Sequence, residues 1–193
     1  LRDELKITST LSETIKLLSN NEVLVDGVRR KEYRHIVGLF DVVSLPLTKQ
    51  NYRLILDTKG RITLLSIPTG ENGVKLCKVT GKTIISGGKT QINLHDGKNI
   101  LSDAKVKVGD SVLLSFPKIE LKEVFTLKAG SPIAIFKGKF AGSTGKFKEI
   151  KDNEVIYTEG DSEKRTLKDY LFILGKDKPA ITIKSTSSTS KTN

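Results

Sequence analysis

The chain has 193 residues, and its 33 Lys and Arg outnumber its 22 Asp and Glu to give a net charge of +11. This excess favours a polyanionic partner, either nucleic acid or an anionic membrane surface. No apolar run approaches the roughly 20 residues of a membrane-spanning helix, and the single cysteine, Cys77, excludes an intramolecular disulfide and favours a reducing compartment.

The positive charge is spread along the chain. Residues 1–47 are neutral overall, residues 48–127 carry +6, residues 128–175 carry +2 and the remainder carries +3. This distribution suits a protein embedded in a large anion better than a domain with one basic arm. The chain contains no Met and opens on Leu1, so we expect a further segment upstream.

Residues 1–7 are expected to be the last turns of one helix, and Thr10 is expected to begin the next. Thr10 is a favourable N-cap, and Glu13 three residues later completes a capping box. The apolar face of this helix is expected to include Leu18, and Asn20 followed by Asn21 is expected to end it.

A short buried strand is predicted at residues 23–25, and Asp26-Gly27 then predicts a tight hairpin turn. Four cationic residues follow this turn: Arg29, Arg30, Lys31 and Arg34. A capped helix and a hairpin that present such a cluster would suit docking on phosphates.

From residue 37 the pattern is that of β-structure. Strands are predicted at residues 42–45, 52–57 and 61–67, the last two joined by a turn at Thr58-Lys59-Gly60. Further short strands follow, separated by Gly81, by Gly87-Gly88 and by Asp96-Gly97, up to residue 127. This spacing predicts a small barrel or sandwich.

Residues 129–156 predict a third unit, with strands at residues 132–136 and 146–150. Three glycines in the connection, Gly138, Gly142 and Gly145, indicate a tightly bent backbone with lysines on either side. Residues up to 183 should close a small barrel, and the Ser/Thr-rich tail from residue 184 should be disordered in isolation.

Catalytic and metal-binding patterns are not evident in the sequence. His35 and His95 lie sixty residues apart, and with one cysteine there is no zinc-type spacing. His95 is interpreted as a turn residue and Cys77 as a small buried hydrophobe. Phosphate-loop, GxSxG and HExxH motifs are absent, and no acidic pair suggests acid–base catalysis, so we expect no cofactor and no bound metal.

The order of these segments resembles the small-subunit ribosomal protein S-four-e family of archaea and eukaryotes. The capped helix followed by VLVDGVRR is similar to the S-four RNA-binding module, and GSPIAIFKGKFAGSTGKFKEI is similar to a KOW motif. Between and after them lie VGLFDVVSL, NYRLILDTKGR, KLCKV, HDGKNI and LFILGKDKPAITI. The chain departs from the family at Leu11, where an Arg is common, and at Ala180, where the family has an aromatic residue.

The resemblance implies a mixed, mainly β fold in three parts. These are an α/β S-four module at residues 1–47, a central β domain at 48–127 and an SH3-like KOW barrel at 128–183, before the tail at 184–193. It implies a structural constituent of the small ribosomal subunit in the cytoplasm, bound to ribosomal RNA and neighbouring ribosomal proteins. Catalysis, a small-molecule substrate and a membrane are not expected.

Two alternatives stay open at this stage. One is an RNA-modifying or tRNA-ligating enzyme with an accessory S-four module, which would require a catalytic domain that the two small β units do not suggest. The other is a transcription-elongation regulator built on the KOW motif.

The residues expected to contact RNA lie in three places. The first is the basic cluster Arg29, Arg30, Lys31 and Arg34, with Lys16 on the polar face of the helix; the second is Lys59 and Arg61 at a hairpin turn; the third is Lys137, Gly138, Lys139, Gly142, Gly145 and Lys146 in the KOW-like connection. Each of these residues can also be explained without RNA, because exposed lysines are commonly only solvated and turn glycines are first of all structural.

Overall fold

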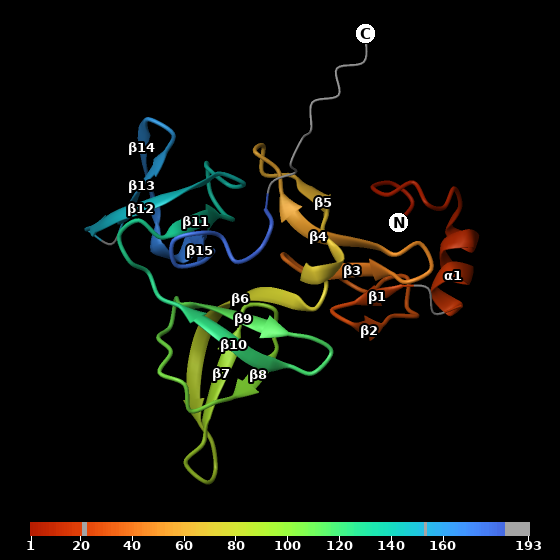
Figure 1. Cartoon of the computed structure of the whole chain (residues 1–193), viewed down its shortest axis with the longest axis horizontal. Helices are drawn as coiled ribbons and strands as arrows, with labels where there is room; N and C mark the ends of the chain where they lie inside the picture. Colours follow the sequence, from red (N-terminus) through yellow and green to blue (C-terminus); the bar gives the residue numbers. More distant parts are fainter. Residues whose placement is uncertain (21–22, 153, 184–193) are drawn as a thin grey trace.

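The computed structural model describes residues 1–20, 23–152 and 154–183. Within them the chain forms one α-helix and three five-stranded antiparallel sheets, one in each of three lobes (Figure 1). The predicted mainly β fold class is confirmed.

The first lobe, coloured red to orange in Figure 1, contains helix α1 (Leu11–Ser19) and a sheet in the order β2-β1-β3-β4-β5. Its strands are β1 (Leu24–Val25), β2 (Val28–Arg29), β3 (Val42–Leu45), β4 (Gln50–Leu56) and β5 (Ile62–Ser66). Leu18 of the helix packs on buried valines of β1 and β3. The sheet continues past residue 47, because β4 pairs with β3 over four residues. We therefore propose that the first unit extends to residue 67.

The second lobe, yellow to green, has the order β10-β9-β6-β7-β8. After a 3-10 turn η1 (Thr69–Glu71) come β6 (Val74–Ile84), β7 (Thr90–Leu94), β8 (Asn99–Leu101), β9 (Ser111–Ser115) and β10 (Glu120–Phe125). The long strand β6 pairs with β9 through its first half and with β7 through its second. Strand β6 is therefore shared by the two halves of a strongly bent sheet.

The third lobe, teal to blue, has the order β14-β13-β12-β11-β15. Its elements are β11 (Pro132–Ile135), β12 (Thr144–Lys151), β13 (Glu154–Glu159), β14 (Ser162–Leu167), a 3-10 turn η2 (Lys168–Tyr170) and β15 (Leu171–Ile173). Strand β11 pairs with both β12 and β15. The predicted closure into a barrel is not seen in the strand pairing of the described residues, because β14 and β15 stand at opposite ends of the strand order and residues 178–183 form no strand.

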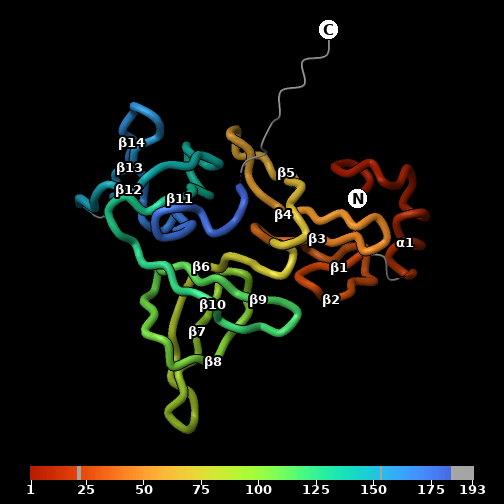
Figure 2. The backbone as a smooth tube through the Cα atoms, in the orientation of Figure 1, coloured from red at the N-terminus to blue at the C-terminus, as the bar shows by residue number. Residues whose placement is uncertain are grey.

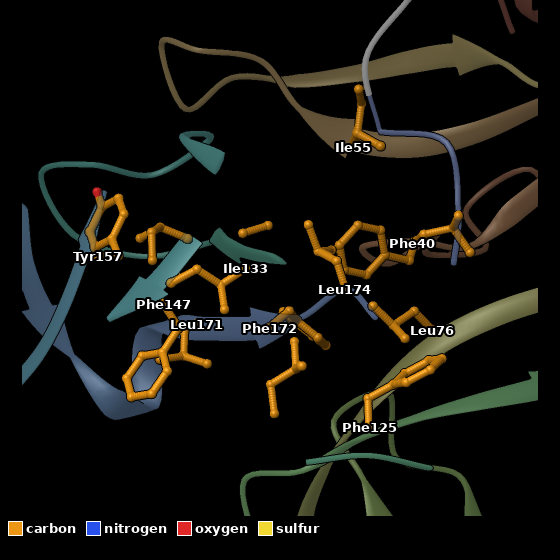
Figure 3. Close-up of a cluster of buried hydrophobic side chains, with 14 of the residues drawn as sticks. Phe40, Ile55, Leu76, Phe125, Ile133, Phe147, Tyr157, Leu171, Phe172 and Leu174 are labelled. Atoms are coloured by element: carbon orange, nitrogen blue, oxygen red, sulfur yellow. The ribbon is translucent and has the colours of Figure 1, made fainter. Parts of the chain in front are cut away.

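A single hydrophobic cluster joins the three lobes (Figure 3). Phe172 lies at its centre, with its ring edge-to-face against Phe40 of the first lobe at 5.0 Å and against Phe136 of the third at 4.9 Å. Leu76 and Phe125 enter the same cluster from the second lobe. The three sheets therefore share buried apolar surface, which favours a fixed arrangement of the lobes.

A second connection fixes the end of the described chain to the first sheet. The side chain of Arg53 in β4 is fully buried, and its guanidinium donates to the carboxylate of Glu71 at 2.8 Å. Glu71 in turn accepts hydrogen bonds from the backbone N–H and the hydroxyl of Thr182. These hydrogen bonds outweigh the effect of burial and lower the pKa of Glu71.

The structure corrects two expectations about elements. Residues 1–7 form turns and no helix, although Leu1 and Leu5 do pack beside α1. Gly81 does not separate two strands, because β6 runs through it with an irregularity in register between Val79 and Gly81. The tail predicted from residue 184 lies outside the described residues.

Candidate RNA-binding surfaces

The predicted helix cap and hairpin are both present. Thr10 accepts a hydrogen bond from the Glu13 N–H, and the Glu13 carboxylate accepts one from the Thr10 N–H, which completes the capping box. Asp26 and Gly27 connect β1 to β2 with φ of 50° and 71°, as a two-residue type I′ turn requires. This turn is not a free tip, since a Cβ at Gly27 would contact Pro117 at 3.4 Å.

The basic cluster after this turn divides into packed and exposed members. Arg29 donates to the Ser19 carbonyl at the end of α1 at 3.2 Å, which caps the helix. Arg30 lines a largely apolar pocket of about 290 Å³ together with Leu5 and Val25. Lys31 is exposed. On the helix, Lys16 is also exposed.

The last member of the cluster, Arg34, is exposed and lies over the ring of Tyr33, 5.2 Å from its centroid. Arg29 is exposed as well, so Lys31 and Arg34 are the exposed members of the four whose side chains are attached neither to α1 nor to the apolar pocket. Lys16 adds a further exposed cation on the same lobe.

The structure brings two of the predicted sites together into one surface. The β4–β5 turn and the β11–β12 connection, from different lobes, lie against each other (Figure 2). A Cβ at Gly60 would meet the Ala141 Cβ at 3.3 Å. We call the cations on these two connections the loop surface: Lys59, Arg61, Lys137 and Lys139, all exposed.

Aromatic rings lie beneath part of this loop surface. Lys137 lies over the ring of Phe136, and Lys139 and Lys164 lie over the ring of Phe140 at 5.8 and 5.0 Å. Cations held over ring faces lose less freedom on meeting a phosphate than freely solvated ones do. The loop surface is thus a partly ordered, positively charged patch.

The three glycines of the connection face protein. A Cβ at Gly138 would lie 3.0 Å from the ring of Tyr170, one at Gly142 only 1.6 Å from the Asp57 carbonyl oxygen, and one at Gly145 2.4 Å from the Thr158 carbonyl oxygen. Their small size is therefore explained by packing between chain segments. Lys146 lies apart from the loop surface and lines a groove of about 630 Å³ with the segment that contains Ala180.

The comparisons with known proteins agree with this architecture. The family model Ribosomal family S4e matches residues 48–121. A small ribosomal subunit protein eS4 from Methanocella arvoryzae is 40% identical over 187 residues, which cover 94% of this chain and 79% of that protein. The chain belongs to the ribosomal family S4e. The eS4 protein from Methanothermobacter thermautotrophicus is 42% identical over 190 residues, covering 95% of this chain and 78% of its own length.

The solved S4e structures include a close fold match. The crystal structure of the 30S ribosomal protein S4e from Thermoplasma acidophilum has a TM-score of 0.78 and 30% sequence identity, and it covers 91% of each chain. The resemblance inferred from the order of motifs is thus confirmed at the level of the family. No helix in the described part of this S4e chain is long and apolar enough to cross a membrane.

A buried charged cluster in this S4e chain was missed by the sequence analysis. The ammonium of Lys75 in β6 contacts the carboxylates of Asp26 at 3.1 Å, of Asp96 at 2.7 Å and of Asp41. Lys98 contacts Asp26 at 2.6 Å and Asp96 at 3.4 Å. Lys75 occupies the space between the three carboxylates, so the cluster is an ion-pair network that joins the first two lobes.

These charges shift one another's pKa values. Burial opposes the charged form of Lys75, but the surrounding carboxylates outweigh it and raise its pKa. Burial also raises the pKa of Asp96, but the hydrogen bond from Lys75 outweighs it and lowers that pKa to about 2. The signal in the sequence was a lysine inside the apolar run VKLCKV, since a strand buried on both faces must provide such a lysine with acidic partners.

Two residues beside this cluster, Cys77 and His95, are more buried than residues in turns or on the surface usually are. Cys77 is fully buried as expected, and burial raises the pKa of its thiol. His95 lies in a turn as expected and is also packed: its Nδ1 accepts from the Lys78 N–H at 3.2 Å, and its ring lies edge-to-face on Phe172 at 4.8 Å. Burial lowers the pKa of His95, so the neutral imidazole is the form that the fold stabilises.

We expect His95 to make the protein sensitive to mild acid. Its folded pKa lies below the ordinary value of 6.5, so the unfolded chain binds the proton first, and stability should fall as pH drops through 6.5 toward the folded pKa. The Asp96 carboxylate adds a separate loss as pH falls from 3.8 toward 2. Urea denaturation at pH 7.5, 6.5 and 5.5 should show a steeper decline for the wild type than for His95→Gln. The exposed His35 provides the control, since His35→Gln should keep the wild-type slope; equal slopes for all three proteins would contradict the assignment to His95.

Proposed function

We propose that this chain is a structural constituent of the small ribosomal subunit, located in the cytoplasm, which binds ribosomal RNA and neighbouring ribosomal proteins without catalysis. The observation that carries the proposal is the match of 40% identity over 94% of the chain to proteins named small ribosomal subunit protein eS4. The net charge of +11 supports a phosphate-rich partner. The enzyme and transcription-regulator alternatives receive no such support from the relatives.

We further propose the loop surface as the principal RNA contact of the folded chain. It gathers cations from two lobes, so its geometry exists only in the assembled fold. The exposed residues Lys31, Arg34 and Lys16 on the first lobe are the second contact. We rank Arg29, Arg30 and the three glycines below these contacts, because Arg29 donates to the Ser19 carbonyl, Arg30 lines an apolar pocket and the glycines lie close to neighbouring segments.

The test is salt-dependent binding to small-subunit ribosomal RNA. For each phosphate contact the slope of log K against log salt changes by about 0.7 to 0.9, so a variant with Lys59→Gln, Arg61→Gln, Lys137→Gln and Lys139→Gln should lose about 3 in slope. The purified proteins are compared by filter binding between 50 and 300 mM salt. Co-sedimentation with small subunits at moderate salt then reports incorporation.

A matched control removes cations that already have acidic partners. Lys148 pairs with Glu163 and Lys176 lies 3.8 Å from Glu123, both on the surface, so Lys148→Gln with Lys176→Gln should leave the slope nearly unchanged. An unchanged slope in the loop-surface variant would remove that surface from the proposal. A wild-type protein that neither binds ribosomal RNA in a salt-dependent way nor sediments with small subunits would refute the proposed function itself.

A further inference from the structure

A groove of about 610 Å³ lies where the second and third lobes meet, away from the loop surface. Its walls are the turn before β9, the connection from β10 to β11, part of β12 and the 3-10 turn η2. We call it the junction groove. None of the cations predicted from the sequence to contact RNA lines it.

Three lysines from three different elements surround the junction groove: Lys107, Lys128 and Lys168. Each is exposed, and none forms an ion pair within the described residues. Of the two acids along the groove, Asp110 is buried and accepts the Lys107 backbone N–H at 2.9 Å, which leaves Glu149 as the only exposed carboxylate among the lining residues. The groove is therefore positively charged at neutral pH.

The walls of the groove are fixed to each other. The buried ammonium of Lys78 in β6 donates to the backbone carbonyls of Lys168 and Asp169, at 3.4 and 2.8 Å, and so attaches η2 to the second lobe. The Ile173 N–H of β15 donates to the Ser111 hydroxyl of β9 at 3.0 Å. The groove is thus formed before any ligand arrives, which lowers the entropic cost of binding.

The floor of the groove is apolar, which distinguishes it from an ordinary lysine patch. Leu127, Phe147 and Leu171 line it, and Val108 and Ile150 remain 56% and 48% exposed at its edge. Phosphate contacts alone would leave these side chains in water. An occupant must therefore offer negative charge and an apolar face together.

We propose that the junction groove binds an unpaired segment of RNA, with phosphates against the three lysines and a base or ribose face over Val108 and Ile150. An A-form duplex presents phosphates but keeps its base faces stacked inside, so it would not cover the floor. The net charge of +11 favours RNA over an acidic protein segment. This inference rests on the proposed function and adds a third, single-strand-selective contact to it.

Two variants of exposed residues separate the charged and apolar contributions. Lys107→Gln, Lys128→Gln and Lys168→Gln together should reduce the salt slope for small-subunit ribosomal RNA by about 2. Val108→Ser with Ile150→Ser should weaken binding roughly tenfold at every salt concentration and leave the slope unchanged, because it removes an uncharged contact. A labelled uridine decamer, measured by fluorescence anisotropy, should lose affinity for both variants, whereas an RNA duplex of equal length should lose affinity for the lysine variant only, because it offers phosphates but no base face.

The possible outcomes separately test the groove as an RNA site, the proposed function and the selectivity for single strands. If both variants bind ribosomal RNA and the decamer as the wild type does, the junction groove is not an RNA site, while the loop-surface result still supports the proposed function. If the variants bind naked RNA normally but sediment poorly with small subunits, the groove faces a protein and the inference is overturned. Equal losses on the duplex and the decamer for the variant with Val108→Ser and Ile150→Ser would overturn selectivity for single strands.

Discussion

Replacing Lys75 by methionine is expected to destabilise the protein by about 3–5 kcal/mol at pH 7.5, which is the usual cost of removing one partner from a buried ion pair. The substitution keeps most of the side-chain volume but leaves the carboxylates of Asp26, Asp41 and Asp96 with Lys98 as the remaining cation. The Lys75 ammonium is also the main cause that lowers the pKa of Asp96, so the loss should be smaller at acid pH, where that carboxylate is protonated, than at pH 7.5. Urea denaturation followed by circular dichroism measures both effects.

Two further variants keep this prediction testable if Lys75→Met does not fold. Lys98 has a side chain that is 28% exposed and contacts two of the same carboxylates, so Lys98→Met should give a smaller loss in the same direction. Lys148→Met removes an exposed pair with Glu163 and should change the free energy of unfolding by about 0–1 kcal/mol. A Lys75 variant no less stable than the Lys148 variant would show that the buried cluster does not hold the first two lobes together.

Replacing Gly142 by alanine is expected to separate the two connections that form the loop surface. The added methyl group would lie 1.6 Å from the Asp57 carbonyl oxygen, and the backbone at Gly142 has φ of 87°. Strain at positive φ costs about 1–2 kcal/mol, and overpacking adds about 1–3 kcal/mol. Both the free energy of unfolding and the affinity for ribosomal RNA should therefore fall.

Gly130 provides a matched control for this substitution. Its φ is 84°, but a Cβ there would meet nothing within 4 Å, so Gly130→Ala should carry the backbone strain alone. The difference between the two variants then reports the contact with Asp57. If Gly130→Ala and Gly142→Ala have the same stability and the same RNA affinity, the packing of the two connections does not support RNA binding.

Local features of this fold were predictable from the sequence because their causes are local. The capping box at Thr10, the two-residue turn at Asp26 and Gly27, and the strands on either side of Lys59 and Gly60 all depend on residues close together in the chain. The family resemblance was predictable because several such segments occur in one order.

Contacts between residues that are distant in the chain were not predictable by the same reasoning. Periodicity identifies β4 and β5 as strands but does not say that β4 pairs with β3, so that both strands extend the first sheet. Likewise, the turn glycines indicate bent backbone, but only the fold shows that Gly142 lies against the backbone of Asp57.

The candidate RNA-binding surfaces show the same difference between local features and contacts of distant residues. The residue types that bind phosphate were evident from charge, whereas the packing roles of Arg29 and Arg30 depend on where their side chains lie. The junction groove combines Lys107, Lys128 and Lys168 from separate segments, and no spacing along the chain relates them.

The hydrogen bonds that join Arg53, Glu71 and Thr182 determine when the first lobe becomes fully stabilised during synthesis of the protein. Arg53 and Glu71 are available to each other early, but Thr182 follows Glu71 by 111 residues. Until those residues leave the translating ribosome, the carboxylate lacks two of its donors and the first lobe lacks its covering segment. A chain truncated before Thr182 should therefore be a better substrate for proteases than the chain that includes it, so that the arrival of Thr182 secures the first lobe.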